Sequence, residues 1–133
     1  MRSNTETIRS FRDLRVWNGA MDLVLATYRL VAKLPAAERF ELGAQLRRAA
    51  VSVPSNIAEG HAGGPRGRYL NHVRIAIGSL AELDTQLEIA RRLGFLTEDD
   101  LVPARGQLAR TGQLLHSLAR SLRQDQALPR TDP

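Results

Sequence analysis

Residues Gln45 to Gly60, QLRRAAVSVPSNIAEG, are the most informative run in this chain because they combine an apolar stripe at helical spacing, an internal proline and a polar stripe. Pro54 has no N–H for the carbonyl of Ala50, so we expect a kinked helix and not a break. Gly60 is a candidate left-handed residue at the C-terminal end of this helix. The helix is expected to begin between residues 36 and 38 and to bury one apolar line: Leu42, Leu46, Ala49, Val53 and Ile57.

A polar stripe runs beside this apolar line and consists of Glu41, Gln45, Arg48, Ser52, Ser55, Asn56 and Glu59. Side chains of this kind can form a buried hydrogen-bond network or a contact with another subunit. Asp84 falls in an apolar sector of a later helix and, if buried, needs a cationic partner such as Arg47 or Arg48. Catalysis is the less favoured interpretation, because no hydroxyl here has a histidine or lysine base near it in sequence. The predicted structural network is Arg48, Ser52, Asn56, Glu59 and Asp84.

The preceding segment predicts a helix from about Asp13 to Lys33, which Pro35 ends. Two apolar sets share this helix. The first is interpreted as the packing seam and consists of Leu14, Trp17, Met21, Val24, Tyr28 and Val31. The second lies beside it and consists of Val16, Ala20, Leu23, Leu30 and Leu34.

The following segment predicts a helix from about Gly67 to Leu93, again with two apolar sets. The core set is Tyr69, Val73, Ile77, Leu80, Leu83, Leu87 and Ala90, and the separate strip is Ile75, Ile89 and Leu93. Gly78 costs a helix interior about 1 kcal/mol relative to Ala, which suggests that another helix approaches closely there.

Both of these helices carry more apolar surface than one core can cover. We therefore expect further copies of the chain to cover the excess. The predicted subunit interface consists of Val16, Leu23, Leu30, Ile75 and Ile89.

The last helix is predicted to begin at Thr97 as N-cap, with three carboxylates in its first turn that complement the helix dipole. Its core positions keep heptad spacing: Leu101, Ala104, Leu108, Thr111, Leu115, Leu118 and Leu122. Four amphipathic helices with short connections, and no strand pattern, predict an all-α, antiparallel up-down-up-down four-helix bundle. Residues 11–123 are expected to form this single domain, between a flexible N-terminus at 1–10 and a flexible tail at 124–133.

The chain is basic, with 19 Lys and Arg against 14 Asp and Glu and a formal net charge of +5. All the basic residues except Lys33 are arginine, whose guanidinium can donate two parallel hydrogen bonds to a phosphate, although a GC-rich genome would also favour arginine. The candidate nucleic-acid contacts are Arg66, Arg68, Arg91, Arg92, Arg120 and Arg123. Solvated surface charge is the alternative for each of them. Aromatic residues are too few to predict base-stacking platforms.

The sequence predicts no catalytic residue, no cofactor and no metal site. It has no cysteine, and His61, His72 and His116 show neither metal-ligand spacing nor the Glu-x-x-His pairs of di-iron bundles. We therefore expect no enzymatic activity. No apolar run approaches the roughly 20 residues that span a bilayer, and residues 1–10 lack a signal-peptide core, so a soluble cytoplasmic protein is expected.

Short motifs between Phe11 and Leu96 resemble those of a known family: LRVW at 14–17, QLRRA at 45–49, SVPSNIAEG at 52–60, GSLAEL at 78–83 and LGFL at 93–96. In these motifs the chain is similar to 23S rRNA intervening-sequence proteins, to which the accessory protein of diversity-generating retroelements is related. The resemblance implies a four-helix bundle that assembles as a homopentameric ring. It also implies, through the retroelement protein, work with nucleic acid. The sequence departs from the family pattern after Gly60, where His61 and the Gly-Gly-Pro at 63–65 replace the usual arginine and serine.

The favoured expectation is a non-enzymatic homo-oligomeric ring, with a pentamer preferred, that binds RNA or DNA through phosphate contacts. The alternative is a structural or adaptor ring that binds a protein partner and no nucleic acid.

Overall fold

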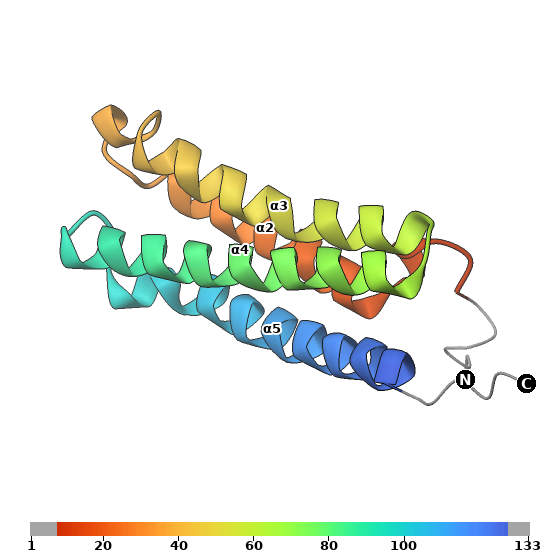
Figure 1. Cartoon of the computed structure of the whole chain (residues 1–133). Helices are drawn as coiled ribbons and strands as arrows, with labels where there is room; N and C mark the ends of the chain where they lie inside the picture. Colours follow the sequence, from red (N-terminus) through yellow and green to blue (C-terminus); the bar gives the residue numbers. More distant parts are fainter. Residues whose placement is uncertain (1–7, 128–133) are drawn as a thin grey trace, which may run out of the picture.

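A computed structural model of the chain describes residues 8–127, with side chains described as far as residue 124. Four long α-helices make up most of this part, and it contains no strand. The elements are η1 (Phe11–Asp13), α2 (Arg15–Val31), η2 (Ala36–Glu38), α3 (Leu42–Ala62), α4 (Arg66–Arg92) and α5 (Glu98–Ala127). Each α-helix packs on the next one in the chain and α2 also packs on α5, so the four enclose a common core (Figure 1). The prediction of an all-α four-helix fold is confirmed.

The structure describes a part of each terminal segment. Ser10 caps η1, because its side chain accepts a hydrogen bond from the N–H of Arg12 at 3.2 Å. Helix α5 continues to Ala127, four residues beyond the predicted end of the domain at residue 123. Residues 1–7 and 128–133 of the expected flexible ends lie outside the described residues.

Helix α2 centres its buried face on the second apolar set, and the predicted packing seam lies at the edge of the core. From that seam Val31 is buried, and Leu14, Trp17 and Val24 are partly buried. Val16, Leu23 and Leu30 are only 7%, 0% and 4% exposed, so they cannot form the subunit interface assigned to them. Tyr28, from the supposed packing seam, is 47% exposed instead. The two sets lie side by side on the helix, and spacing alone does not say which set faces the neighbouring helices.

Helix α3 buries all five residues of its predicted apolar line and continues through Pro54 as one helix. Gly60 does not end it in a left-handed conformation, because the helix continues to Ala62 and the turn residue with positive φ is Gly64. Gly60 instead marks the closest approach of α3 to α4. A Cβ added to it would lie 2.8 Å from both the Cβ of His72 and the Cδ1 of Tyr69.

Helix α4 buries most of its predicted core set and leaves Ile75, Ile89 and Leu93 on the surface, as expected for a separate strip. Gly78 marks no close contact with another helix, since no atom of the other described helices lies within 4 Å of the position of an added Cβ.

Helix α5 begins as predicted. The hydroxyl of Thr97 accepts a hydrogen bond from the N–H of Asp100 at 3.1 Å, and Asp100 Oδ2 accepts one from the N–H of Thr97 at 2.9 Å. These reciprocal bonds satisfy two amides that the helix leaves unpaired. The heptad positions Leu101, Leu115 and Leu122 are fully buried along the rest of the helix.

Candidate nucleic-acid interface

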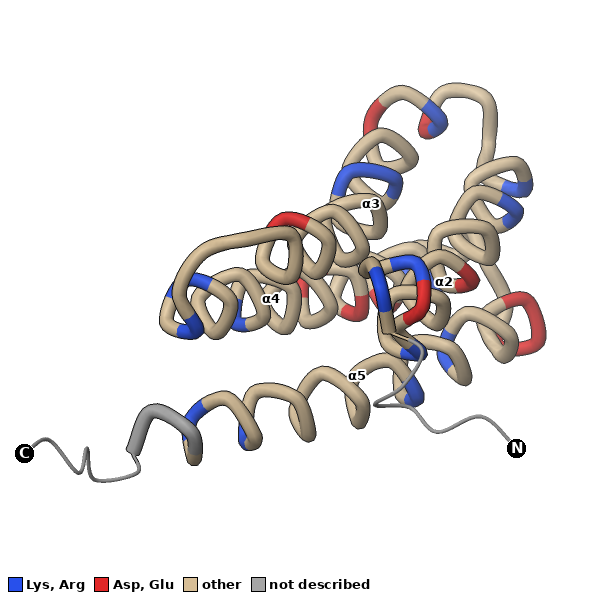
Figure 2. Tube along the Cα trace, turned by 90° about the vertical axis from the view of Figure 1, so that its right-hand side faces the viewer, with Lys and Arg blue, Asp and Glu red and all other residues tan. Residues whose placement is uncertain are grey.

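Arginines gather at one end of the bundle, where α3 ends, α4 begins and α5 ends (Figure 1). We define the arginine-rich end as residues 8–16, 58–75 and 117–124, which contain eight arginines and two carboxylates. Figure 2 views the bundle from this side and shows basic segments on η1, at the start of α4 and along the last turns of α5. The opposite end, residues 30–47 and 88–105, contains six basic and six acidic residues. The chain's excess positive charge is therefore concentrated at the arginine-rich end.

Arg68 holds the loop at this end in place. Its Nη1 donates hydrogen bonds to the carbonyls of Gly63 at 2.8 Å and Glu59 at 3.3 Å, which caps the C-terminus of α3. Gly64 turns the chain with φ of +100°. The guanidinium stays exposed to solvent, so it can cap the helix and still face an external anion.

Two aromatic pairs lie at the same end. The rings of Phe11 and Trp17 have centroids 5.2 Å apart, and the guanidinium of Arg12 lies 4.9 Å above the Phe11 ring. His61 and Tyr69 meet edge to face at 5.8 Å, and burial raises the pKa of the Tyr69 hydroxyl above its ordinary value. Aromatic residues are few in the sequence, yet these two pairs both lie at the arginine-rich end.

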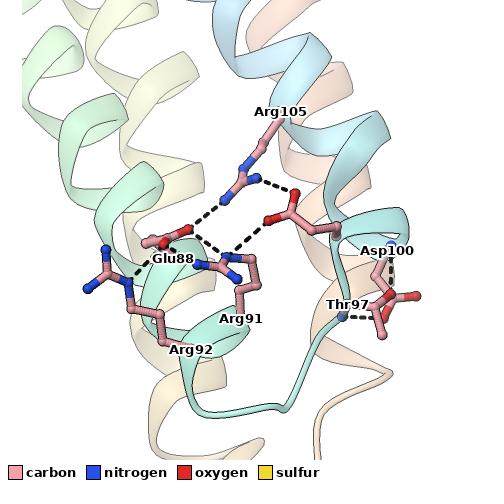
Figure 3. Close-up of polar contacts among 7 residues, drawn as sticks. Glu88, Arg91, Arg92, Thr97, Asp100 and Arg105 are labelled. Atoms are coloured by element: carbon pink, nitrogen blue, oxygen red, sulfur yellow. Dashed lines mark hydrogen bonds and ion pairs between the residues drawn. The ribbon is translucent and has the colours of Figure 1, made fainter.

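Arg91 and Arg92 lie at the other end of the bundle and are engaged with carboxylates (Figure 3). Glu88 accepts hydrogen bonds from Arg91 at 2.7 Å, from Arg92 at 2.9 Å and from Arg105 at 2.8 Å. Glu98 pairs with Arg91 at 3.1 Å and with Arg105 at 3.0 Å, which ties α4 to α5. The hydrogen bonds from Arg91 and Arg92 lower the pKa of Glu88 to about 2.

The structure therefore divides the six candidate contacts into two groups. Arg66, Arg68, Arg120 and Arg123 belong to the arginine-rich end, whereas Arg91 and Arg92 lie beside carboxylates that compete with any external anion. Part of this division could have been predicted, because Glu88 precedes Arg91 and Arg92 by three and four residues on one helix. The contacts with Glu98 and Arg105 form only when α4 packs on α5.

The predicted polar network exists in part and lies between α3 and α4. Ser52 and Ser79 share a hydrogen bond of 2.8 Å between their Oγ atoms, and Asn56 Nδ2 donates to Ser52 Oγ at 3.1 Å. Because the amide of Asn56 donates to Ser52, its Oδ1 is left to accept the Nδ1–H of His72 at 2.9 Å. His72 Nδ1 also lies 3.9 Å from Glu59 Oε2.

Two of the predicted network members do not take part. Arg48 and Asp84 are exposed, and no hydrogen bond between Asp84 and Arg47 or Arg48 occurs among the described residues. The true partners on α4, His72 and Ser79, were missed. Their seven-residue spacing places them on one side of that helix and was the available signal.

No group of three or more His, Cys, Asp or Glu side chains among the described residues could hold a metal ion. An open groove of about 630 Å³ between α4 and α5 has an apolar floor of Ile77, Leu80 and Leu108, with Asp84, His116 and Arg120 among its lining residues. Within residues 8–127, no helix is long and apolar enough to cross a membrane.

Comparison with solved structures finds a protein of unknown function from the S23 ribosomal protein family of Bacteroides thetaiotaomicron. Its crystal structure matches with a TM-score of 0.70 over 78% of this chain and 97% of that chain. The sequences are 20% identical, so this similarity speaks for the fold alone. No curated protein matches the chain.

The comparison with family models agrees with the motifs that run through α2, α3 and α4. The model of the 23S rRNA-intervening sequence proteins matches residues 12–117, which include nearly all of the four-helix core. With most of its length matched, the chain belongs to the 23S rRNA-intervening sequence protein family.

Proposed function

We propose that this chain is a non-enzymatic module that binds RNA or DNA phosphates with the arginine-rich end of an antiparallel, up-down-up-down bundle. It acts as a homo-oligomeric ring, with a pentamer as the favoured assembly. Several copies of the arginine-rich end would then engage one nucleic-acid chain together, so that weak contacts add up.

The uneven distribution of charge carries this proposal. Eight arginines and two carboxylates lie at one end, whereas basic and acidic residues balance at the other. Nucleic acid is a polyanion, and neutralising its phosphates releases counterions, which is the main source of binding free energy in sequence-independent complexes. The planar guanidinium also matches two phosphate oxygens at once. A surface with this charge and this side-chain type favours phosphate contacts over base recognition.

A salt series with matched variants tests the proposal. Binding of short RNA and DNA fragments is measured by fluorescence anisotropy for the parent chain, for Arg120→Gln/Arg123→Gln and for Arg91→Gln/Arg92→Gln. For duplex DNA, log K should fall linearly with log salt, and the slope should shrink by about 0.9 for each phosphate contact removed. We expect this reduction only in the first variant, because Arg91 and Arg92 belong to the cluster around Glu88.

The two variants remove the same formal charge, each from two arginines near the C-terminal end of a helix, so they control for net charge. Equal reductions in both would show that the arginine-rich end has no special part in binding. No binding of the parent chain even at low salt would contradict the proposal and favour the structural or adaptor ring. Circular dichroism confirms that each variant remains folded.

A further inference from the structure

Two apolar surfaces remain exposed on different helices. The first, which we name the α2/α3 patch, consists of Leu25, Tyr28, Ala44, Arg47, Arg48 and Val51. Leu25, Tyr28 and Val51 are 51%, 47% and 40% exposed. The second, the α4 strip, consists of Ile75, Gly78, Glu82, Thr85 and Ile89, in which the two isoleucines are 45% and 43% exposed. Helix α2 packs mainly on α3 and α5, and α4 packs on the same two helices from the other side, so the two surfaces belong to different sides of the bundle (Figure 1).

The α2/α3 patch is a basic apolar groove. A hollow of about 480 Å³ lies between α2 and α3, lined by Tyr28, Val51 and the two arginines among others. No carboxylate lines it. A surface that fits it should therefore present apolar side chains together with a negative charge.

The α4 strip has these properties. Ile75, Glu82 and Ile89 are seven residues apart and so lie along one side of the helix, with the carboxylate midway between the isoleucines. Gly78 leaves the surface between Ile75 and Glu82 bare, because no atom of the other helices that the structure describes lies within 4 Å of an added Cβ. The glycine is unfavourable in a helix, and it makes no close contact with another described helix of the chain. A second backbone that approaches there would explain it.

We propose that the α2/α3 patch of one copy docks on the α4 strip of the next copy. Tyr28 and Val51 then cover Ile75 and Ile89, and Arg47 and Arg48 face Glu82. This inference rests on the oligomeric half of the proposed function and is independent of nucleic-acid binding. Of the interface predicted from the sequence, Val16, Leu23 and Leu30 are buried in the core and take no part in this contact. Ile75 and Ile89 are exposed and do take part.

Charge decides between this head-to-tail contact and a symmetric one. If two copies met through their α2/α3 patches, arginines would face arginines. If they met through their α4 strips, Glu82 of one copy would face Glu82 of the other. Both symmetric contacts are therefore repulsive. When two copies dock through two different surfaces, the resulting pair still has one free α2/α3 patch and one free α4 strip. Such a contact continues from copy to copy and closes into a ring when the rotation permits.

A complementation experiment tests the contact. Tyr28→Asp/Val51→Asp spoils the patch and leaves the strip intact, whereas Ile75→Asp/Ile89→Asp spoils the strip and leaves the patch intact. All four positions are exposed, so the substitutions should leave the chain folded, which circular dichroism checks. Mass is measured by light scattering. We expect the parent to be an oligomer, each variant alone to be a monomer, and an equimolar mixture of the two to be a dimer.

Ser117→Asp, at an exposed position of α5 outside both surfaces, is the control and should keep the parent mass. A monomeric parent would overturn this contact together with the oligomeric half of the proposed function. An oligomeric parent whose mass neither double variant changes would overturn the contact alone. Two monomeric variants that form no dimer on mixing would overturn the head-to-tail arrangement.

Discussion

Gly60 and Gly78 both lie within helices, yet the structure predicts opposite effects for the same substitution to alanine. Gly60 has a φ outside the left-handed region, so an alanine there suffers no backbone strain. Its methyl group would, however, lie 2.8 Å from the Cβ of His72, which is attached directly to the backbone of α4. The conflict can be relieved only if α4 moves away from α3.

The magnitude follows from two opposing contributions. Forcing an extra methyl group into a packed interface typically costs about 1–3 kcal/mol. Alanine in place of glycine returns up to about 1 kcal/mol of helix stability, and less at Gly60 because α3 ends two residues later. We therefore expect Gly60→Ala to lower the free energy of unfolding by about 1–2 kcal/mol. Gly78→Ala meets no atom within 4 Å and should raise it by about 1 kcal/mol.

Urea denaturation followed by circular dichroism measures both changes. The two substitutions are placed in the Ile75→Asp/Ile89→Asp background, so that subunit association does not contribute to the unfolding midpoint. The m-values should agree with that of the background chain, since neither substitution alters the surface exposed on unfolding. If Gly60→Ala proved as stable as Gly78→Ala, the close approach of α3 and α4 at this glycine would be refuted.

Three further predictions concern the ends and the core of the bundle. The pKa of Glu88 is lowered from 4.5 to about 2, so its stabilising effect is complete above pH 4.5 and is lost as the pH falls towards 2; urea midpoints over this range should fall more steeply in the parent than in Glu88→Gln, and parallel curves would contradict the pairing with arginine. Thr97→Ala removes the hydroxyl that accepts from Asp100 and should cost about 1 kcal/mol of unfolding free energy, whereas an unchanged midpoint would mean that the cap is unimportant. Leu23→Ala, at a fully buried position, should cost about 2–5 kcal/mol, and a change in oligomer mass without loss of stability would show that Leu23 is at a subunit contact after all.

The buried line of α3 and the N-cap of α5 were predictable because they depend on residues that are close in sequence. The line from Leu42 to Ile57 was predicted from spacing and is buried, and Thr97 was predicted as a cap from its own side chain and the carboxylates that follow. These signals act within one or two turns, so the rest of the fold does not change them.

Of the candidate site, the sequence could predict only that arginine is abundant and not where the arginines gather. An excess of arginine is visible in the sequence, but its concentration at one end depends on which helix ends meet. Arg91 and Arg120 look alike as arginines on helical segments. Arg91 pairs with Glu88 three residues earlier on its own helix, which the sequence could have shown. Its contact with Glu98, and the place of Arg120 in the groove between α4 and α5, depend on how the two helices pack.

Periodicity is a property of the local chain, so the four amphipathic helices and their wide apolar faces follow from the order of the residues. The choice of which apolar residues of α2 became buried required the packed bundle, in which Leu23 is in the core and Tyr28 is at the surface. Adjacent stripes on one helix have the same spacing, so spacing does not distinguish them. The choice between them depends on the volume and position of the side chains that α3 and α5 bring against them.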